Sequence, residues 1–143
     1  MGYIKTMKIN TKIRYGLRML VMLGAKQEVI NTGDLGEQMK VSPKYLRKLA
    51  GPLERSGLIQ SVQGIYGGYR LNKDPGDISI SDIFDAFEEK ISISGCLGGK
   101  SCPLNEECLT RPIWLHLENL IQNEFYRITV KDILENKFDI PSS

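Results

Sequence analysis

Two short helical segments followed by a glycine-rich hairpin pattern constrain the fold of this chain most strongly. The segment VSPKYLRKLAGPLERSGLI begins with Ser42 as a helix N-cap and Pro43 at the first helical position, where a missing amide hydrogen costs nothing. A shorter segment, GDLGEQMKV, has Thr32 as its predicted cap and ends just before Ser42. Two helices at this spacing, the second with a basic outer face, are typical of a helix-turn-helix.

One local conflict lies inside the second helix of this pair. Pro52 follows Gly51, and an interior proline removes one backbone hydrogen bond of a helix. We therefore expect a bend near Gly51 or two helical pieces.

A β-hairpin is predicted next. Residues 59–63 and 69–72 are strand-like, and Gly64, Gly67 and Gly68 between them permit a tight turn. A hairpin after a helix-turn-helix is a wing, whose tip is able to enter the minor groove of DNA. A purely structural hairpin is the alternative.

Four more helices complete the expected fold. A helix over residues 10–26, capped by Asn10 or Thr11, precedes the pair; a helix from Ser81, a long helix after Arg111 and a short one over 129–135 follow it. The predicted class is mainly α: a winged helix-turn-helix domain (1–80) with a small hairpin wing, then a cysteine-loop sensor and dimerisation region (81–143).

The long helix carries one apolar stripe, which suggests burial against a partner helix. A homodimer fits because two-fold proteins read two half-sites of a palindromic operator. The alternative is that this helix folds back on its own wing domain. The predicted dimer residues are Ile113, Leu117, Leu120, Ile121 and Phe125.

Charge divides the chain at the same boundary. Residues 1–73 carry 13 Lys/Arg and 4 Asp/Glu, whereas residues 74–143 carry 6 and 13. A basic half joined to an acidic half indicates a module that binds a polyanion, here double-stranded DNA, attached to a module with another task. We find no dinucleotide or phosphate-loop motif and no catalytic His/Asp pair, so an enzyme is not expected.

All three cysteines lie within thirteen residues: Cys96, Cys102 and Cys108, spaced C-x5-C-x5-C. The chain shows no signal peptide or bilayer-spanning run, so we expect a cytoplasmic protein, in which clustered thiols bind metal or do redox chemistry. Five-residue gaps favour an iron–sulfur cluster over zinc, whose knuckles are usually tighter. Zinc, a redox-sensing thiol and inert cysteines remain open on chemistry alone.

Four segments resemble the Rrf2 family of bacterial transcription regulators: MKINTKIRYGLRML, VSPKYLRKLAGPLERSGLI, SVQGIYGGYRL and CLGGKSCPLNEECLT. The resemblance runs from about Met7 to Phe138. It implies that the three cysteines ligate an iron–sulfur cluster, with a [2Fe–2S] cluster preferred to a [4Fe–4S] cluster. The candidate DNA-binding residues are Ser42, Pro43, Lys44, Tyr45, Arg47, Lys48, Tyr66, Gly67, Gly68, Tyr69 and Arg70.

The chain departs from the family pattern at the fourth cluster ligand. Arg111 stands where the IscR branch has a ligand histidine, and Arg14 stands where some NsrR proteins have an acidic residue from the partner subunit. An arginine cannot serve as an ordinary ligand. His116, which would reach the site only if its helix starts late, and Glu106 or Glu107 are the remaining candidates in the chain. Otherwise the fourth ligand comes from the partner subunit or from a small molecule.

The wing departs as well, because Gln63, Ile65 and Tyr66 replace an arginine, a proline and a glycine of the IscR branch. The expected function is a regulator that senses cluster status, redox stress or nitric oxide, with an IscR-like role preferred. An NsrR-like nitric oxide sensor and a cluster-free regulator controlled by a protein partner are the alternatives.

Overall fold

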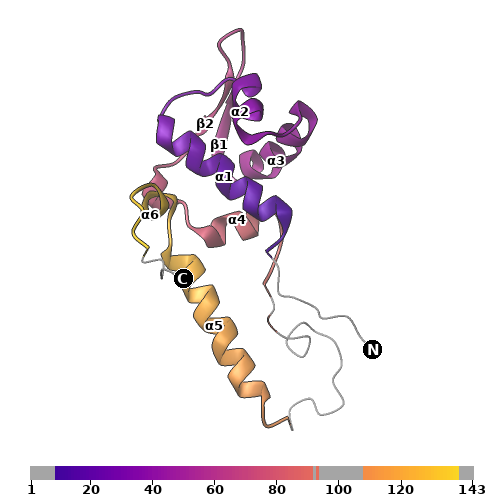
Figure 1. The fold of residues 1–143 in the computed structure, drawn as a ribbon, viewed down its shortest axis with the longest axis vertical. Coiled ribbons are helices and arrows are strands. Elements are labelled where there is room, and N and C mark those ends of the chain that lie inside the picture. Colours follow the sequence, from indigo (N-terminus) through magenta and orange to yellow (C-terminus); the bar gives the residue numbers. More distant parts are fainter. Residues whose placement is uncertain (1–8, 92, 94–107, 139–143) are drawn as a thin grey trace.

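A computed structural model describes residues 9–91, 93 and 108–138. Cys96 and Cys102, with the candidate ligands Glu106 and Glu107, lie outside the described residues. The described part is mainly helical with one two-stranded antiparallel hairpin, which confirms the predicted class (Figure 1). Its elements are α1 (Thr11–Lys26), α2 (Thr32–Met39), α3 (Pro43–Arg55), β1 (Ile59–Val62), β2 (Gly68–Leu71), the 3-10 turn η1 (Pro75–Asp77), α4 (Ile80–Ala86), α5 (Arg111–Arg127) and α6 (Val130–Leu134).

Helix α1 lies at the centre of the fold and contacts α2, α3, α4, α6 and β2. Asn10 caps it by accepting a hydrogen bond from the Lys12 amide at 2.8 Å. Met19 is fully buried because neighbours surround this helix on several sides. Gly16 admits the Phe87 ring so closely that an added Cβ would lie 2.8 Å from it.

Helices α2 and α3 form the predicted pair. Asn31 caps α2, one residue before the predicted Thr32, because its side chain accepts from the Gly33 amide at 2.8 Å. Ser42 caps α3 as predicted. The helix continues through Pro52 as one element, so the break into two pieces does not occur. The α3 residues buried in the core are Leu46, Leu49, Ala50 and Leu53.

Strands β1 and β2 form the wing, in a register that runs from Ile59 opposite Leu71 to Val62 opposite Gly68. The loop before α2 pairs with the other side of β2 in an antiparallel bridge, since Ile30 and Tyr69 exchange two backbone hydrogen bonds of 2.9 and 3.0 Å. The wing is thereby joined to the start of the helix-turn-helix.

Helices α4 and α6 begin side by side with matching caps. Ser79 and Asp82 form a capping box on α4, and Thr129 and Asp132 form one on α6. The predicted cap Ser81 is instead buried within α4. An antiparallel bridge pairs Ser79 with Thr129.

One hydrophobic core runs across the predicted domain boundary at residue 80. Phe84 of α4 and Val130 of α6 belong to the same cluster as the buried side chains of α1 and α3. Helices α4 and α6 are therefore packed directly onto the winged helix-turn-helix.

Helix α5 projects away from this body, toward the end of the molecule opposite the wing (Figure 1). Ile121 and Phe125 pack against the core, and Phe125 stacks on Phe84 with ring centroids 4.9 Å apart. Ile113 and Leu120, farther toward its start, are 46% and 48% exposed. Among the described helices, none combines the length and apolarity needed to cross a bilayer.

Candidate nucleic-acid interface and cysteine segment

The outer face of α3 presents four cations. Lys44, Arg47, Lys48 and Arg55 are exposed, whereas Leu46 and Leu49 on the same helix are buried. The predicted separation of a basic face from an apolar face is thus present in the fold. Such a face suits phosphate contacts and the reading of base edges.

The first turn of α3 is stabilised by a helix cap and by a contact between two tyrosine rings. The Ser42 hydroxyl accepts a hydrogen bond from the Tyr45 amide at 3.1 Å. The half-buried Tyr45 ring meets the Tyr15 ring edge to face, with centroids 5.9 Å apart. Ser42 and Pro43 are exposed at the helix start and Tyr45 is half-buried; contact with DNA stays a prediction for all three.

The predicted contact residues of the wing fall into an exposed group and a buried group. Tyr66 is 92% exposed at the tip, and Arg70 is exposed while it donates two hydrogen bonds, of 3.0 and 3.2 Å, to the Gln60 side chain. Gly67 and Gly68 are buried against the loop before α2, where a Cβ on Gly68 would lie 1.9 Å from the Ile30 carbonyl oxygen. These two glycines position the wing, and contact with DNA remains a prediction for both.

Glu54 and Tyr69 connect the wing to α3. The Glu54 carboxylate accepts hydrogen bonds from the Ser61 hydroxyl at 2.7 Å and from the Ser61 amide at 3.3 Å. Burial raises the pKa of the half-buried Tyr69 phenol, and the nearby Glu54 charge raises it further, while Arg47 acts in the opposite direction. Tyr69 therefore stays a neutral hydrogen-bonding group at physiological pH.

A cleft of about 530 Å³ lies between α3, the start of α1 and the end of α4. Lys48 and Arg55 line one side, and Asp85 and Glu88 line the other. Beyond it, Glu89 accepts a hydrogen bond from Asn10 at 3.4 Å and lies 3.8 Å from the Lys12 ammonium. The end of α4 is thus close to both α1 and α3.

Cys108 is the one predicted cluster ligand among the described residues. It is half-buried, its Sγ lies 3.2 Å from the Thr110 hydroxyl, and its carbonyl accepts a hydrogen bond from the Arg111 amide at 3.3 Å. Within residues 9–91, 93 and 108–138, no three His, Cys, Asp or Glu side chains gather as a metal site.

The structure also places the departures from the family pattern. Helix α5 starts at Arg111, so the late start that would bring the exposed His116 to the cysteines does not occur; His116 lies about 7.5 Å farther along the axis. Arg14 is exposed on α1 and donates a hydrogen bond to Thr11 at 3.5 Å.

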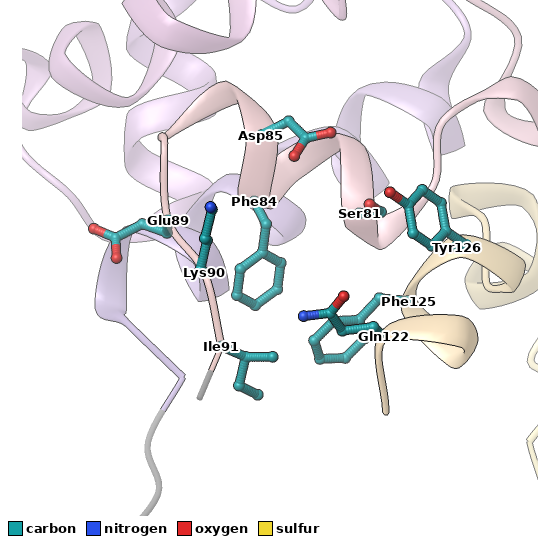
Figure 2. Close-up of a pocket in the computed structure, with 9 residues that line it drawn as sticks. All are labelled: Ser81, Phe84, Asp85, Glu89, Lys90, Ile91, Gln122, Phe125 and Tyr126. Atoms are coloured by element: carbon teal, nitrogen blue, oxygen red, sulfur yellow. The ribbon is translucent and has the colours of Figure 1, made fainter. Parts of the chain in front are cut away.

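A cavity of about 240 Å³ lies where α4, the segment after it and α5 meet. Figure 2 shows the Phe84 and Phe125 rings facing it, with Ile91 beside them at the point where the chain leaves toward the cysteines. Gln122 and Lys90 add polar groups to its wall. Ile91, five residues before Cys96 in the sequence, therefore lies at the junction of α4 and α5.

Sequence reasoning missed two features of this surface. Ile65, noted only as a departure from the family, is 89% exposed beside Tyr66 at the wing tip. Its signal was a large apolar residue within a glycine-bounded turn. The link from Glu54 to Ser61 had no local signal, because it joins residues of two different elements.

Comparison with known proteins places this arrangement in a family. The family model of Rrf2, described as an iron-dependent transcriptional regulator, matches residues 9–136. The HTH-type transcriptional regulator IscR of Cronobacter sakazakii is 29% identical over 92% of this chain and 82% of its own length.

Solved structures agree with this match. CymR, the global cysteine regulator of B. subtilis, superposes with a TM-score of 0.78 at 29% identity, covering 94% of this chain and all of the other. IscR of T. potens superposes with a TM-score of 0.70 at 25% identity, covering 95% and 93%. These relatives are regulators and not enzymes, and the family match spans nearly the whole chain. The chain therefore belongs to the Rrf2 family of DNA-binding transcription regulators.

Proposed function

We propose that this chain is a homodimeric, cytoplasmic regulator that binds a palindromic operator and holds an iron–sulfur cluster on Cys96, Cys102 and Cys108. The observation that carries the proposal is the place in the sequence of the stretch from Cys96 to Cys108, the cysteine segment, which follows α4 and precedes α5. This segment connects α4, which packs against α1 and α3, to α5, the helix with an unpartnered apolar end. A change in the segment is thereby coupled to the surface that carries the α3 cations.

The donor set fits a cluster but leaves it one protein ligand short. Three thiolates are the soft ligands that iron–sulfur clusters use, and Arg111 supplies none. We infer that the fourth ligand is Glu106, Glu107, a group from the partner subunit or a small molecule. When bound, such a cluster supplies a centre that oxidants, nitric oxide or iron limitation alter. A weak fourth ligand makes the cluster easier to lose, which suits a sensor.

Helix α4 is the proposed route from the cysteine segment to DNA. Ile91 and Phe84 face the cavity at the exit of α4, and Phe87 on the same helix lies against Gly16 of α1. The cleft beyond α4 is lined by Lys48 and Arg55 of α3. A shift of α4 would alter the orientation of α3, and the cluster state would change DNA affinity by a population shift.

The proposed dimer uses the exposed end of α5. Ile113, Leu117 and Leu120 recur at intervals of four and three residues, which places them along one side of the helix. A two-fold axis beside this helix sets the spacing of two α3 helices on neighbouring half-sites. The cysteine segment adjoins the start of the same helix, so cluster state and half-site spacing are linked.

A cluster-free regulator controlled by a protein partner is the second candidate. One observation favours it: Arg111 occupies the ligand position of the IscR branch. In that case the cavity beside Phe84 and Phe125 is the surface through which a partner would act.

Anaerobic purification with optical and Mössbauer spectra tests the first candidate against the second. A cluster-holding protein gives visible absorption and iron quadrupole doublets, and its operator affinity changes when the cluster is removed with a chelator. Colourless protein with unchanged operator binding after iron–sulfur reconstitution would support the cluster-free candidate. The triple variant Cys96→Ala, Cys102→Ala and Cys108→Ala, carried through the same reconstitution, is the matched control.

A further inference from the structure

The tip of the wing exposes two consecutive large apolar side chains. Ile65 and Tyr66 are 89% and 92% exposed, and neither belongs to the hydrophobic cluster of the fold. The turn from Gln63 to Gly67 contains no lysine or arginine. Both side chains are therefore available to contact a partner surface.

The turn that carries the tip is hydrogen-bonded within itself and to the loop before α2. The Gly67 amide donates to the Gly64 carbonyl at 3.0 Å and closes the turn. The Asn31 side chain donates to the Gly67 carbonyl at 3.4 Å, and the paired bonds of Ile30 with Tyr69 fix the strand that follows. These bonds fix the wing relative to the start of α2, and the hydrogen bonds between Ser61 and Glu54 fix β1 relative to α3.

The charges around the wing point to DNA as the partner. Lys44, Arg47 and Lys48 on α3, which packs against β1, and Arg70 on β2 are exposed cations. They supply phosphate attraction, which the uncharged tip cannot. A second copy of the chain is a poorer partner, because it would bring the same cations toward this wing. In addition, two side chains bury far less than the ~1,000 Å² that a stable protein interface needs.

We propose that Ile65 and Tyr66 insert as an apolar wedge into a base-pair step from the minor groove, unstack it and bend the operator. This inference rests on the proposed binding of DNA. It adds a mechanism by which the wing selects a DNA sequence. Apolar side chains inserted in this way kink DNA by about 20–90° toward the major groove.

Sequence selection follows from the cost of opening the step. Pyrimidine–purine steps unstack most easily, whereas A-tracts are stiff. The wing thus favours a flexible step beneath its tip without any hydrogen bond to a base edge. Preference at this position should therefore depend on side-chain volume at residues 65 and 66.

The test uses the full-length dimer and an operator selected in vitro from random DNA. End-labelled operators report the bend by energy transfer, and 2-aminopurine at the step under the wing reports unstacking. We compare wild type with Tyr66→Ala, Ile65→Ala and the conservative Tyr66→Phe. Lys44→Ala is the matched control, because it removes a cation while it keeps the wedge.

The wedge predicts a bent operator and bright 2-aminopurine with wild type and with Tyr66→Phe. Wild type should prefer the flexible step on the order of tenfold. Tyr66→Ala should straighten the DNA and reduce this preference toward none, and the double variant Ile65→Ala/Tyr66→Ala should do so more strongly. Lys44→Ala should weaken binding and keep the bend. Circular dichroism should match wild type throughout, since both side chains are exposed.

Three results would overturn the wedge. Straight DNA with dark 2-aminopurine in the wild-type complex would leave the proposed function intact and place no side chain in the step. Loss of the bend in Tyr66→Phe would assign the effect to the phenolic hydroxyl. A changed oligomeric state in Tyr66→Ala would make the tip a contact between copies. Failure of wild type to select any DNA would instead contradict the proposed function itself.

Discussion

Arg111 stands at the ligand position of the IscR branch and also begins a helix. It is the first residue of α5, and its amide donates to the Cys108 carbonyl, so its backbone shapes the turn that follows the third cysteine. Its guanidinium cannot donate a lone pair to iron. A histidine at the same position would offer an imidazole nitrogen without changing the backbone path.

The cysteine site can be tested residue by residue. Cys96→Ala, Cys102→Ala and Cys108→Ala should each abolish cluster retention, because each removes one of the three proposed thiolate ligands. Arg111→His should slow loss of the cluster in air, whereas Arg111→Ala should leave the wild-type rate. Optical decay of anaerobically purified protein after exposure to air measures both effects.

His116→Ala is the control within the chain. Since α5 starts at Arg111 and carries His116 away from Cys108, this variant should keep wild-type spectra and lifetime. Loss of the cluster in His116→Ala would mean that α5 unwinds at its start in the loaded protein. Native regulation of DNA binding in all three cysteine variants would contradict the sensing role.

At the scale of elements, caps and turns made the helix-turn-helix and the wing predictable. Ser42 before Pro43 and the glycines after residue 63 are local signals that act through the backbone itself. Boundaries shifted where two residues compete for one role: Asn31 in place of Thr32, and Ser79 in place of Ser81. In both cases the residue that aligned with the amide of the first turn became the cap.

Helix α3 should supply much of the DNA affinity through its cations. Replacing Lys44 and Lys48 by Ala removes two exposed charges and should flatten the log–log salt dependence of binding by about 0.9 per lost phosphate contact. Titrations of operator binding over a range of salt concentrations measure this slope. The pair Lys26→Ala and Lys131→Ala, on α1 and α6, should leave the slope near wild type. Equal slopes for both pairs would remove α3 from the interface.

The capping box at the start of α6 predicts a pH-dependent stability. Hydrogen bonding from the Thr129 amide, followed by its hydroxyl, lowers the pKa of Asp132, and the Lys137 charge adds to the shift. A lowered folded-state pKa means that the contribution is complete above the unfolded pKa of about 4 and is lost as pH falls through the folded value.

Asp132→Asn should therefore lower the Tm at pH 7 and approach wild type in acid, near pH 3. Thermal unfolding followed by circular dichroism at both values makes the comparison. Asp74→Asn, which makes no cap hydrogen bond at the start of η1, is the control and should show no such pH-dependent gap. A gap for Asp132→Asn of equal size at both pH values would contradict the assigned cause.

At the scale of the whole molecule, the long apolar stripe of α5 has two destinations. Ile121 and Phe125, both predicted for the dimer, pack on the chain's own core through Phe84, as the fold-back alternative anticipated. Ile113 and Leu120 remain exposed. Sequence periodicity could not separate these halves, because both lie on one stripe and only the position of α4 decides which half it covers. The cysteine ligands, two of which lie outside the described residues, stay a prediction.

Leu120→Asp should dissociate the proposed dimer. It places a charge on the exposed part of the stripe, where a partner helix would desolvate it at a cost of several kcal/mol. Sedimentation equilibrium measures the dimer, and operator affinity should fall with it. Asn119→Asp adds the same charge about 100° round the helix and should stay dimeric. Retention of wild-type association by Leu120→Asp would place the dimer contact elsewhere.

The bridge between Ser79 and Thr129 has a consequence for how the molecule opens. The Ile80 amide donates to the Ile128 carbonyl at 3.1 Å, and the Val130 amide donates to the Ile78 carbonyl at 2.9 Å. Neither hydrogen bond can break alone without loosening both helix starts. The two amides should therefore exchange with deuterium in a single opening event, although fifty residues separate them. Removal of the chain from Thr129 onward would release α4 as well as α6, and with α4 the support of the reading helix.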